Sequence, residues 1–323
     1  MLFLTVLLAA APTPIGLGTD GGRVGFDDLS YAPAFGRVLV PAGSTGKLDL
    51  IDPATKAVTS VAGFSTQSVK GGHGDGTTSA DFGAGFVFAS DRGRSELTIV
   101  DATALKFLAT APLAAGPDYV RWVEPLKEVW VTEPKDKAIE FFALEPGPKL
   151  VLKGKFVIDG GPESLVIDAS RGRAYTHTWK DTTVAIDLKS HREVARWKNG
   201  CAASRGIALD ASNGLLFVGC DEGKVVVLDV AHDGKPLGEA KTPKGVDLIA
   251  FSPKLRHLYV PGGDDAAMAI FAVGDRGALR RLTEVKTAAE ATCVVADDRG
   301  GVWLCDPNAG RVLFLQDERT PPD

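Results

Sequence analysis

The sequence predicts an all-β protein, a seven-bladed β-propeller closed by an N-terminal strand that completes the last blade. Three observations support this prediction. A pattern of short apolar segments repeats seven times, each repeat divides into strands and turns, and the last repeat lacks a strand that the first residues can supply. The hydrophobic fraction of 45% and the charged fraction of 24% are ordinary for a globular protein.

The repeat is clearest in a short apolar segment whose final position recurs at regular intervals. This position falls at Asp52, Asp101, Ala143, Asp187, Asp229, Ala272 and Gln316. The steps between these positions are 49, 42, 44, 42, 43 and 44 residues. A period of about 43 residues is the size of one propeller blade of four strands.

The fifth repeat shows the internal order of strands and turns. Residues 206–210, 215–219 and 224–229 are predicted strands, and polar turns separate them. A further turn leads to a fourth strand that ends near Thr242. Short strands joined by Gly, Asn and Asp turns are typical of antiparallel pairing. Because no stretch keeps a helical period of 3.6 residues, we expect little helix.

The two ends of the chain complement each other. The seventh repeat stops after its third strand, at Leu315, and the segment Ile15 to Val24 belongs to no repeat. We expect this segment to supply the missing strand, because pairing the two ends removes an exposed sheet edge. One propeller domain should therefore cover residues 13–316, followed by a polar C-terminal tail at 317–323.

The first residues indicate export. Leu2 to Ala11 is an apolar run that is too short to span a bilayer, which takes about 20 residues in a helix. It is typical of a signal peptide, here residues 1–12, although no Lys or Arg precedes it. A buried first strand is the alternative interpretation. No later segment approaches membrane-spanning length, so we expect a periplasmic or extracellular monomer without a transmembrane segment.

The composition argues against some partners and supports the same compartment. A net charge of −5 argues against nucleic acid as a partner, which requires a basic surface. Four cysteines, with no CxxC spacing, fit an oxidising compartment and allow three disulfide connectivities. Cys201 with Cys220 and Cys293 with Cys305 are favoured, because each pair lies at neighbouring strand ends of one repeat. The five tryptophans are expected to pack between blades.

Two segments resemble the YVTN family of propeller repeats, which includes lactonase-like enzymes. They are Asn213–Asp229, which reads NGLLFVGCDEGKVVVLD, and Leu255–Pro261, which reads LRHLYVP. All seven repeats carry part of the pattern, so the resemblance covers nearly the whole chain and implies the propeller fold. No catalytic motif of the lactonases can be placed on this sequence. Fold by itself implies no chemistry.

The resemblance implies that the loops entering the first strands share one face, around the mouth of a central channel. Aligning the repeats places five charged residues in this column: Asp27, Asp118, Glu163, Arg205 and Asp247. Converging carboxylates can bind a divalent cation such as calcium, here through Asp118, Glu163 and Asp247, or can act as a general acid or base. A solvated acidic rim is the alternative.

Two histidines complete the candidate residues. His177 lies one position before the end of a second strand, on the same expected face. His73 lies in the Gly-rich segment Ser68–Thr78, which accounts for the step of 49 residues. Gly-rich loops allow close approach to a ligand, but a flexible surface insertion is the alternative. The string Gly16–Gly21 matches GxGxxG, but a strand follows it, so a nucleotide site is not expected.

These observations favour an exported binding or interaction module that holds a protein, peptide or small-molecule ligand on its acidic channel-mouth face. Two other classes stay open. A metal-assisted hydrolase of the lactonase type would need a bound divalent cation, and a structural, envelope-associated protein would need neither metal nor ligand. The sequence leaves open whether the protein is an enzyme, because no catalytic triad or zinc-protease string is present.

Overall fold

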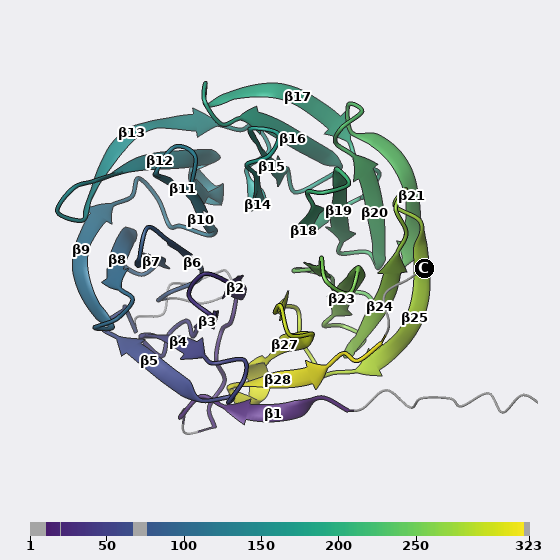
Figure 1. Ribbon diagram of the computed structural model, residues 1–323, viewed down its shortest axis with the longest axis horizontal. Coiled ribbons are helices and arrows are strands. Elements are labelled where there is room, and N and C mark those ends of the chain that lie inside the picture. The colour runs from purple at the N-terminus through teal and green to yellow at the C-terminus, as the bar shows by residue number, and fades with distance from the viewer. Residues whose placement is uncertain (1–10, 20, 67–75, 320–323) are drawn as a thin grey trace, which may run out of the picture.

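Seven four-stranded antiparallel sheets form a closed ring in the computed structural model, which describes residues 11–19, 21–66 and 76–319 (Figure 1). Each sheet is one blade, and in six of the blades the strands follow chain order from the centre of the ring outward, whereas in the seventh the first strand of the chain, β1, is the outermost. The predicted seven-bladed propeller is confirmed. Two single turns of 3-10 helix, η1 (Pro134–Asp136) and η2 (Pro307–Ala309), are the helical elements among the described residues.

The strands of the first three blades are β2 (Ser30–Ala32), β3 (Arg37–Pro41), β4 (Lys47–Ile51) and β5 (Val58–Ala62) in blade 1; β6 (Ala80–Gly83), β7 (Phe86–Asp91), β8 (Glu96–Asp101) and β9 (Lys106–Pro112) in blade 2; and β10 (Val120–Val123), β11 (Glu128–Glu133), β12 (Ala138–Glu145) and β13 (Lys149–Val157) in blade 3.

Blades 4 to 6 consist of β14 (Glu163–Asp168), β15 (Arg173–His177), β16 (Thr182–Asp187) and β17 (Arg192–Lys198); β18 (Ser204–Asp210), β19 (Leu215–Cys220), β20 (Lys224–Asp229) and β21 (Lys235–Lys241); and β22 (Ala250–Ser252), β23 (His257–Gly262), β24 (Ala267–Val273) and β25 (Leu279–Lys286). Blade 7 contains β26 (Val294–Ala296), β27 (Gly301–Asp306), β28 (Arg311–Gln316) and β1 (Thr13–Gly16).

The core lies between neighbouring blades. One cluster, for example, packs Leu39 and Leu50 of blade 1 against Val87 and Val100 of blade 2. The second strands β7 and β11 are buried along almost their whole length because neighbouring blades cover both of their faces. The outermost strands instead alternate between exposed and half-buried residues. Each of β9, β13, β17, β21 and β25 carries Lys or Arg, which protects an outer edge against pairing with another chain.

The repeating aspartate has a local structural role. Asp101 Oδ1 accepts hydrogen bonds from the backbone N–H groups of Thr103 and Ala104, both at 2.8 Å. Asp52 and Asp229 bond the following turn in the same way. The carboxylate satisfies turn donors that the sheet leaves unpaired, which is why an acid recurs where the third strand ends.

The ring closes through the N-terminal strand, as predicted. β1 pairs antiparallel with β28, with Thr13 opposite Phe314 and Gly16 opposite Arg311. The strand begins earlier and is shorter than the predicted segment 15–24. Gly18, at a φ of +65°, turns the chain, and Val24 N then donates to the Pro307 carbonyl at 2.9 Å.

The first residue of the C-terminal tail, Asp317, is buried against blade 6. Asp317 is 2% exposed and accepts hydrogen bonds from Tyr259 Oη and Arg319 Nη1, at 2.9 and 2.7 Å, and its Oδ2 lies 2.9 Å from His257 Nδ1. Burial alone would raise the pKa of Asp317, but these hydrogen bonds outweigh it and lower that pKa to about 2. The tail therefore anchors to blade 6.

Both favoured disulfides are present. Cys201 bonds Cys220, with Cα atoms 5.4 Å apart, and Cys293 bonds Cys305, with Cα atoms 5.5 Å apart. Each bridge joins strand ends within one blade, which agrees with an oxidising, exported location. No helix in the described part of the chain is long and apolar enough to cross a membrane. The expected signal peptide, residues 1–12, lies almost entirely outside the described residues.

Removing residues 1–16 should destabilise the ring by about 2–4 kcal/mol, because the edge of β28 loses its partner and about four net hydrogen bonds. Urea unfolding of the truncated and full-length proteins measures this difference. Removing residues 1–10 is the matched control, since β1 then stays intact. Equal unfolding midpoints for the two truncations would contradict closure through β1.

Replacing Cys201 and Cys220 together by alanine should lower the free energy of unfolding by about 2–3 kcal/mol, because the bridge no longer restricts the unfolded chain. Thermal unfolding measures the change, and peptide mapping without reduction should recover Cys201 with Cys220 and Cys293 with Cys305. Four free thiols in secreted protein would refute both pairings.

Candidate functional site

The structure brings the five aligned charged residues together around the central channel. We call Asp27, Asp118, Glu163, Arg205 and Asp247 the mouth residues. Each lies within three residues of the start of an innermost strand: β2, β10, β14, β18 or β22. Figure 1 shows β2, β10, β14 and β18 facing the centre of the ring. The entry loops therefore converge on one face.

Arg92 joins two of the mouth carboxylates. Its Nη2 atom lies 3.2 Å from Asp27 Oδ2 and also donates to Asp118, while Nε donates to the Pro117 carbonyl at 2.9 Å. Burial and the nearby charge of Asp118 raise the pKa of Asp27 well above its usual range, and Arg92 opposes this shift. Sequence alignment missed Arg92 because it follows β7 rather than preceding a first strand.

Glu163 has the clearest electrostatic perturbation at the mouth. Burial, followed by the charges of Asp118 and Asp247, raises the pKa of Glu163 to about 8. A hydrogen bond from Trp179 and the charge of Arg205 offset only part of this shift. A carboxyl group with a pKa of about 8 is half-protonated near pH 8 and mostly protonated at pH 7, and a nearby cation would favour its charged form.

Trp179 lies beside Glu163 and is exposed at the mouth. Its indole Nε1 donates to Glu163 Oε2, and 44% of the residue is exposed. The prediction that all the tryptophans pack between blades is wrong for Trp179. The reason is its place in the turn between β15 and β16, which the neighbouring blades do not cover. An exposed aromatic face next to a carboxyl group suits a cationic ligand.

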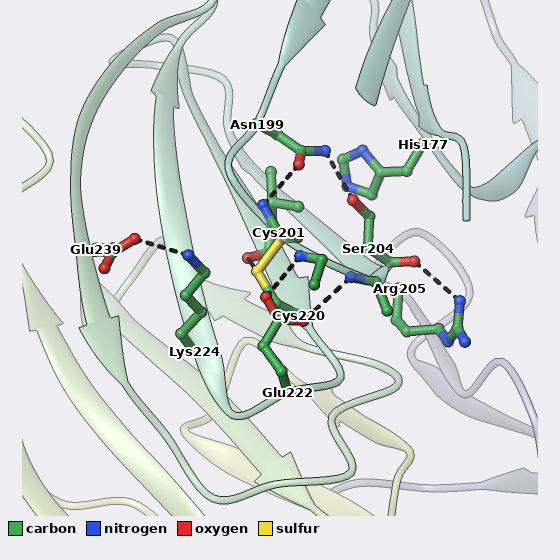
Figure 2. Close-up of a disulfide and its surroundings, with 12 residues drawn as sticks. His177, Asn199, Cys201, Ser204, Arg205, Cys220, Glu222, Lys224 and Glu239 are labelled. Atoms are coloured by element: carbon green, nitrogen blue, oxygen red, sulfur yellow. Dashed lines mark hydrogen bonds and ion pairs between the residues drawn. A yellow bond between two sulfur atoms is a disulfide. The ribbon is translucent and has the colours of Figure 1, made fainter. Parts of the chain in front are cut away.

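Arg205 is held close to the first disulfide (Figure 2). It follows Ser204, whose carbonyl accepts from Arg205 Nη1 at 3.3 Å. Asn199 Nδ2 donates to Ser204 Oγ at 2.9 Å, and the Asn199 carbonyl side chain accepts from Cys201 N at 3.1 Å. The disulfide and this network therefore anchor the start of β18 and the position of Arg205.

His177 is not exposed at the mouth. It pairs with Glu163 across β14 and β15 and is fully buried, with its Nδ1 atom 3.0 Å from Thr183 Oγ1. Burial lowers the pKa of His177 to about 3, so the imidazole is neutral at physiological pH. Its Nε2 atom is buried and has no hydrogen-bond partner among the described residues.

A second charged layer, not found by alignment, lies just inside the mouth. Arg121 forms a two-pronged ion pair with Asp28, with Nη1–Oδ2 and Nη2–Oδ1 distances of 2.5 and 3.0 Å. Arg121 Nε also donates to the Leu165 carbonyl at 3.0 Å, and Ser79 Oγ donates to Asp28. Polar residues inside short apolar strands were the available sequence signal, but only the fold pairs them.

A buried acidic pair supports the loop that carries Asp118. Glu133 Oε1 accepts from Ala115 N at 3.1 Å, and Glu140 Oε2 accepts from Ala114 N at 3.3 Å. Burial, together with the neighbouring Glu140, raises the pKa of Glu133 to about 7. The loop that precedes Asp118 therefore rests on two carboxyl groups that cannot easily both be charged.

No compact carboxylate shell for a metal is formed at the mouth within the described residues. Among the described residues, three possible ligands have their ligand atoms within 4.8 Å of one another. They are Cys201, Cys220 and Glu222. The two sulfurs form the disulfide, so they are not thiolate ligands. The calcium site expected at Asp118, Glu163 and Asp247 stays a prediction. His73 lies outside the described residues.

The fold defines a seven-bladed β-propeller. No family model matches the chain, and no curated protein matches its sequence. The resemblance to YVTN repeats therefore rests on the quoted segments alone. Solved structures do share the fold.

Three of these similar structures cover nearly the whole chain. A chain from "Crystal Structure of Mitotic Checkpoint Complex" has a TM-score of 0.78 at 12% identity and covers 98% of this chain and 94% of its own. Hydrazine synthase from Kuenenia stuttgartiensis has a TM-score of 0.74 at 14% identity, with coverages of 93% and 97%. The Cps50 (Swd1) propeller of Myceliophteria thermophila has a TM-score of 0.73 at 12% identity, with coverages of 93% and 98%. Such low identities show the fold alone.

Glu163→Gln should flatten the pH dependence of stability. Because the folded-state pKa of Glu163 is about 8 and the unfolded value is 4.5, its contribution is fully present below pH 4.5 and is lost as the pH rises through 8. The wild type should lose about 1–2 kcal/mol more than the variant between pH 5 and pH 8.5. Urea unfolding at both pH values measures this difference, with the exposed Glu145→Gln as control. Parallel pH profiles for the wild type and Glu163→Gln would contradict the shift.

Proposed function

We propose that the chain is an exported binding module whose acidic mouth holds a cationic group of a protein, peptide or small-molecule ligand. The observation that carries the proposal is the environment of Glu163. The charges of Asp118 and Asp247 act on its carboxyl group. The exposed side chain of Trp179 donates a hydrogen bond to the same group. A positive group placed there would relieve carboxylate repulsion and contact an aromatic face.

The disulfides and the apolar N-terminal run support export. Both bridges form between strand ends of one blade, where reduced cysteines would have no evident role, and such bridges persist in oxidising compartments. Export remains part of the proposal. Secretion of the full-length protein, with loss of a short N-terminal segment by mass spectrometry, is its direct test.

The similar chain from a structure named for a checkpoint complex is compatible with a protein partner. At 12% identity that likeness concerns the fold, so the choice of a cationic group rests on the mouth residues. Calcium bound by Asp118, Glu163 and Asp247 is the competing occupant. The same measurement separates the two, because calcium and a basic peptide can be added independently.

Calorimetric titration should show that a capped Gly-Lys-Gly peptide binds, whereas capped Gly-Glu-Gly does not. The double change Glu163→Gln with Asp247→Asn should weaken binding about tenfold or more, because two charge-assisted contacts are lost. Glu145→Gln, an exposed acid away from the mouth, should leave the affinity unchanged. A hundredfold excess of peptide over Kd should raise the free energy of unfolding by about 2.7 kcal/mol.

Two results would refute the proposal of a cationic organic ligand. One is stabilisation by calcium at constant ionic strength with no response to the lysine peptide, which would favour the metal. The other is no response to either, which would leave the mouth as a solvated acidic rim. Peptide binding that is equal in the wild type and the double variant would place the ligand elsewhere on the ring.

A further inference from the structure

A cavity of about 180 Å³ lies in the central channel. Its lining includes Asp28, Tyr119 and Leu248, and each of these directly follows a mouth residue in the chain. The cavity is therefore immediately inside the mouth. A dry engineered cavity of about 150 Å³ holds one benzene molecule, so this one has room for a single side chain or a very small molecule.

One side of the cavity is formed by the innermost strands of blades 5, 6 and 7. The lining residues there are the consecutive runs 207–209, 248–251 and 294–296. β18, β22 and β26 are end strands of their sheets, so each has one edge without a partner in its own blade. Such an edge presents backbone carbonyl and N–H groups, which favours a ligand that forms hydrogen bonds.

The opposite side holds the Asp28–Arg121 ion pair and Tyr119. The ion pair already uses both oxygens of Asp28 and, with the Leu165 carbonyl, most of the donors of Arg121. It is neutral as a unit and needs no ligand to balance it. Arg121 also lies over the Tyr119 ring, at 5.2 Å from its centroid, which fixes the orientation of the phenol.

Tyr119 brings a polar hydroxyl group to the lining of the cavity. Tyr119 is 4% exposed and lines the cavity, and no hydrogen bond to its oxygen is found in the described residues. Burial and the charges of Asp247, Asp28, Asp27 and Glu163 raise its pKa well above the usual range, so the phenol stays neutral. A neutral phenol can accept from a cationic donor and donate to a carboxylate.

We propose that the mouth and this cavity together bind one primary ammonium group on a short unbranched chain, with Tyr119 as the buried acceptor. The group is a lysine side chain of a partner protein or a free small amine. This inference rests on the proposed function, because the mouth carboxylates attract the cation. It adds the chemical group, the depth of insertion and the residue that recognises it.

An ammonium group matches the site better than the other cations do. Three acceptors satisfy it, and one of them can be the Tyr119 hydroxyl, whereas calcium takes about six to eight oxygen ligands. A guanidinium prefers one planar carboxylate in a two-pronged contact, and Arg121 already occupies Asp28 in that way. The alkyl chain of the inserted amine would leave the channel past the exposed indole of Trp179.

The test is a calorimetric titration with n-butylammonium, capped lysine and capped arginine, with n-butanol as the uncharged control. Tyr119→Phe removes only the hydroxyl and should weaken n-butylammonium and capped lysine about tenfold or more, since a hydrogen bond to a charged group is lost. Tyr31→Phe, which removes a phenol hydroxyl outside the cavity, is the matched control and should change neither. Circular dichroism and the melting temperature confirm that each variant is folded.

The outcomes separate this inference from the proposed function. Lysine binding that Glu163→Gln weakens and Tyr119→Phe does not would leave the mouth function standing and overturn the cavity site. Equal affinity for capped lysine and capped arginine would also overturn it. Absence of binding by all three cations would refute both. Tighter binding of a lysine peptide than of n-butylammonium would identify a partner protein as the source of the amine. Tighter binding of n-butylammonium would identify a free amine as the ligand.

Discussion

The structure depends on one constraint: each blade buries both faces of its sheet against its neighbours, so the ring has to close. Leu39 and Leu50 on one blade and Val87 and Val100 on the next lose their contact with water only because the blades stack side by side. An open ring would expose one apolar sheet face on each of its two end blades and the edge of β28. The pairing of β1 with β28 satisfies this constraint, and it joins residues about 300 positions apart in the chain.

Closure also creates the charge cluster. The seven entry loops meet around one axis, so charges that are distant in sequence approach within the range of strong electrostatic coupling. The fold compensates this repulsion in two ways. Arg92 bridges Asp27 and Asp118, and Arg121 neutralises Asp28. The pKa of Glu163 rises to about 8 mainly because its carboxyl group is buried, and the charges of Asp118 and Asp247 add to that shift.

Some residues of the candidate site were predictable from the sequence and others were not, and the difference has a physical cause. Asp27, Asp118, Glu163, Arg205 and Asp247 share one register in the repeat, so alignment alone places them at one face. Arg92 and Trp179 escape this alignment because they lie just after a second strand, and Tyr119 escapes it because it lies one position after the aligned column. His177 shares the expected face but is fully buried, with its Nδ1 atom 3.0 Å from Thr183 Oγ1 on the neighbouring strand of the same blade.

The sequence by itself determined the all-β class, the number of blades, the closure by the first strand and both disulfide pairings. These follow from periodicity and from strand-end positions, which are local properties of the chain. Tertiary structure alone decided the Asp28–Arg121 pair, the place of Tyr119 in the cavity lining, the burial of Asp317 and the exposure of Trp179. The reason is that each depends on which side chains from different blades face the same small volume, and no repeat period encodes that.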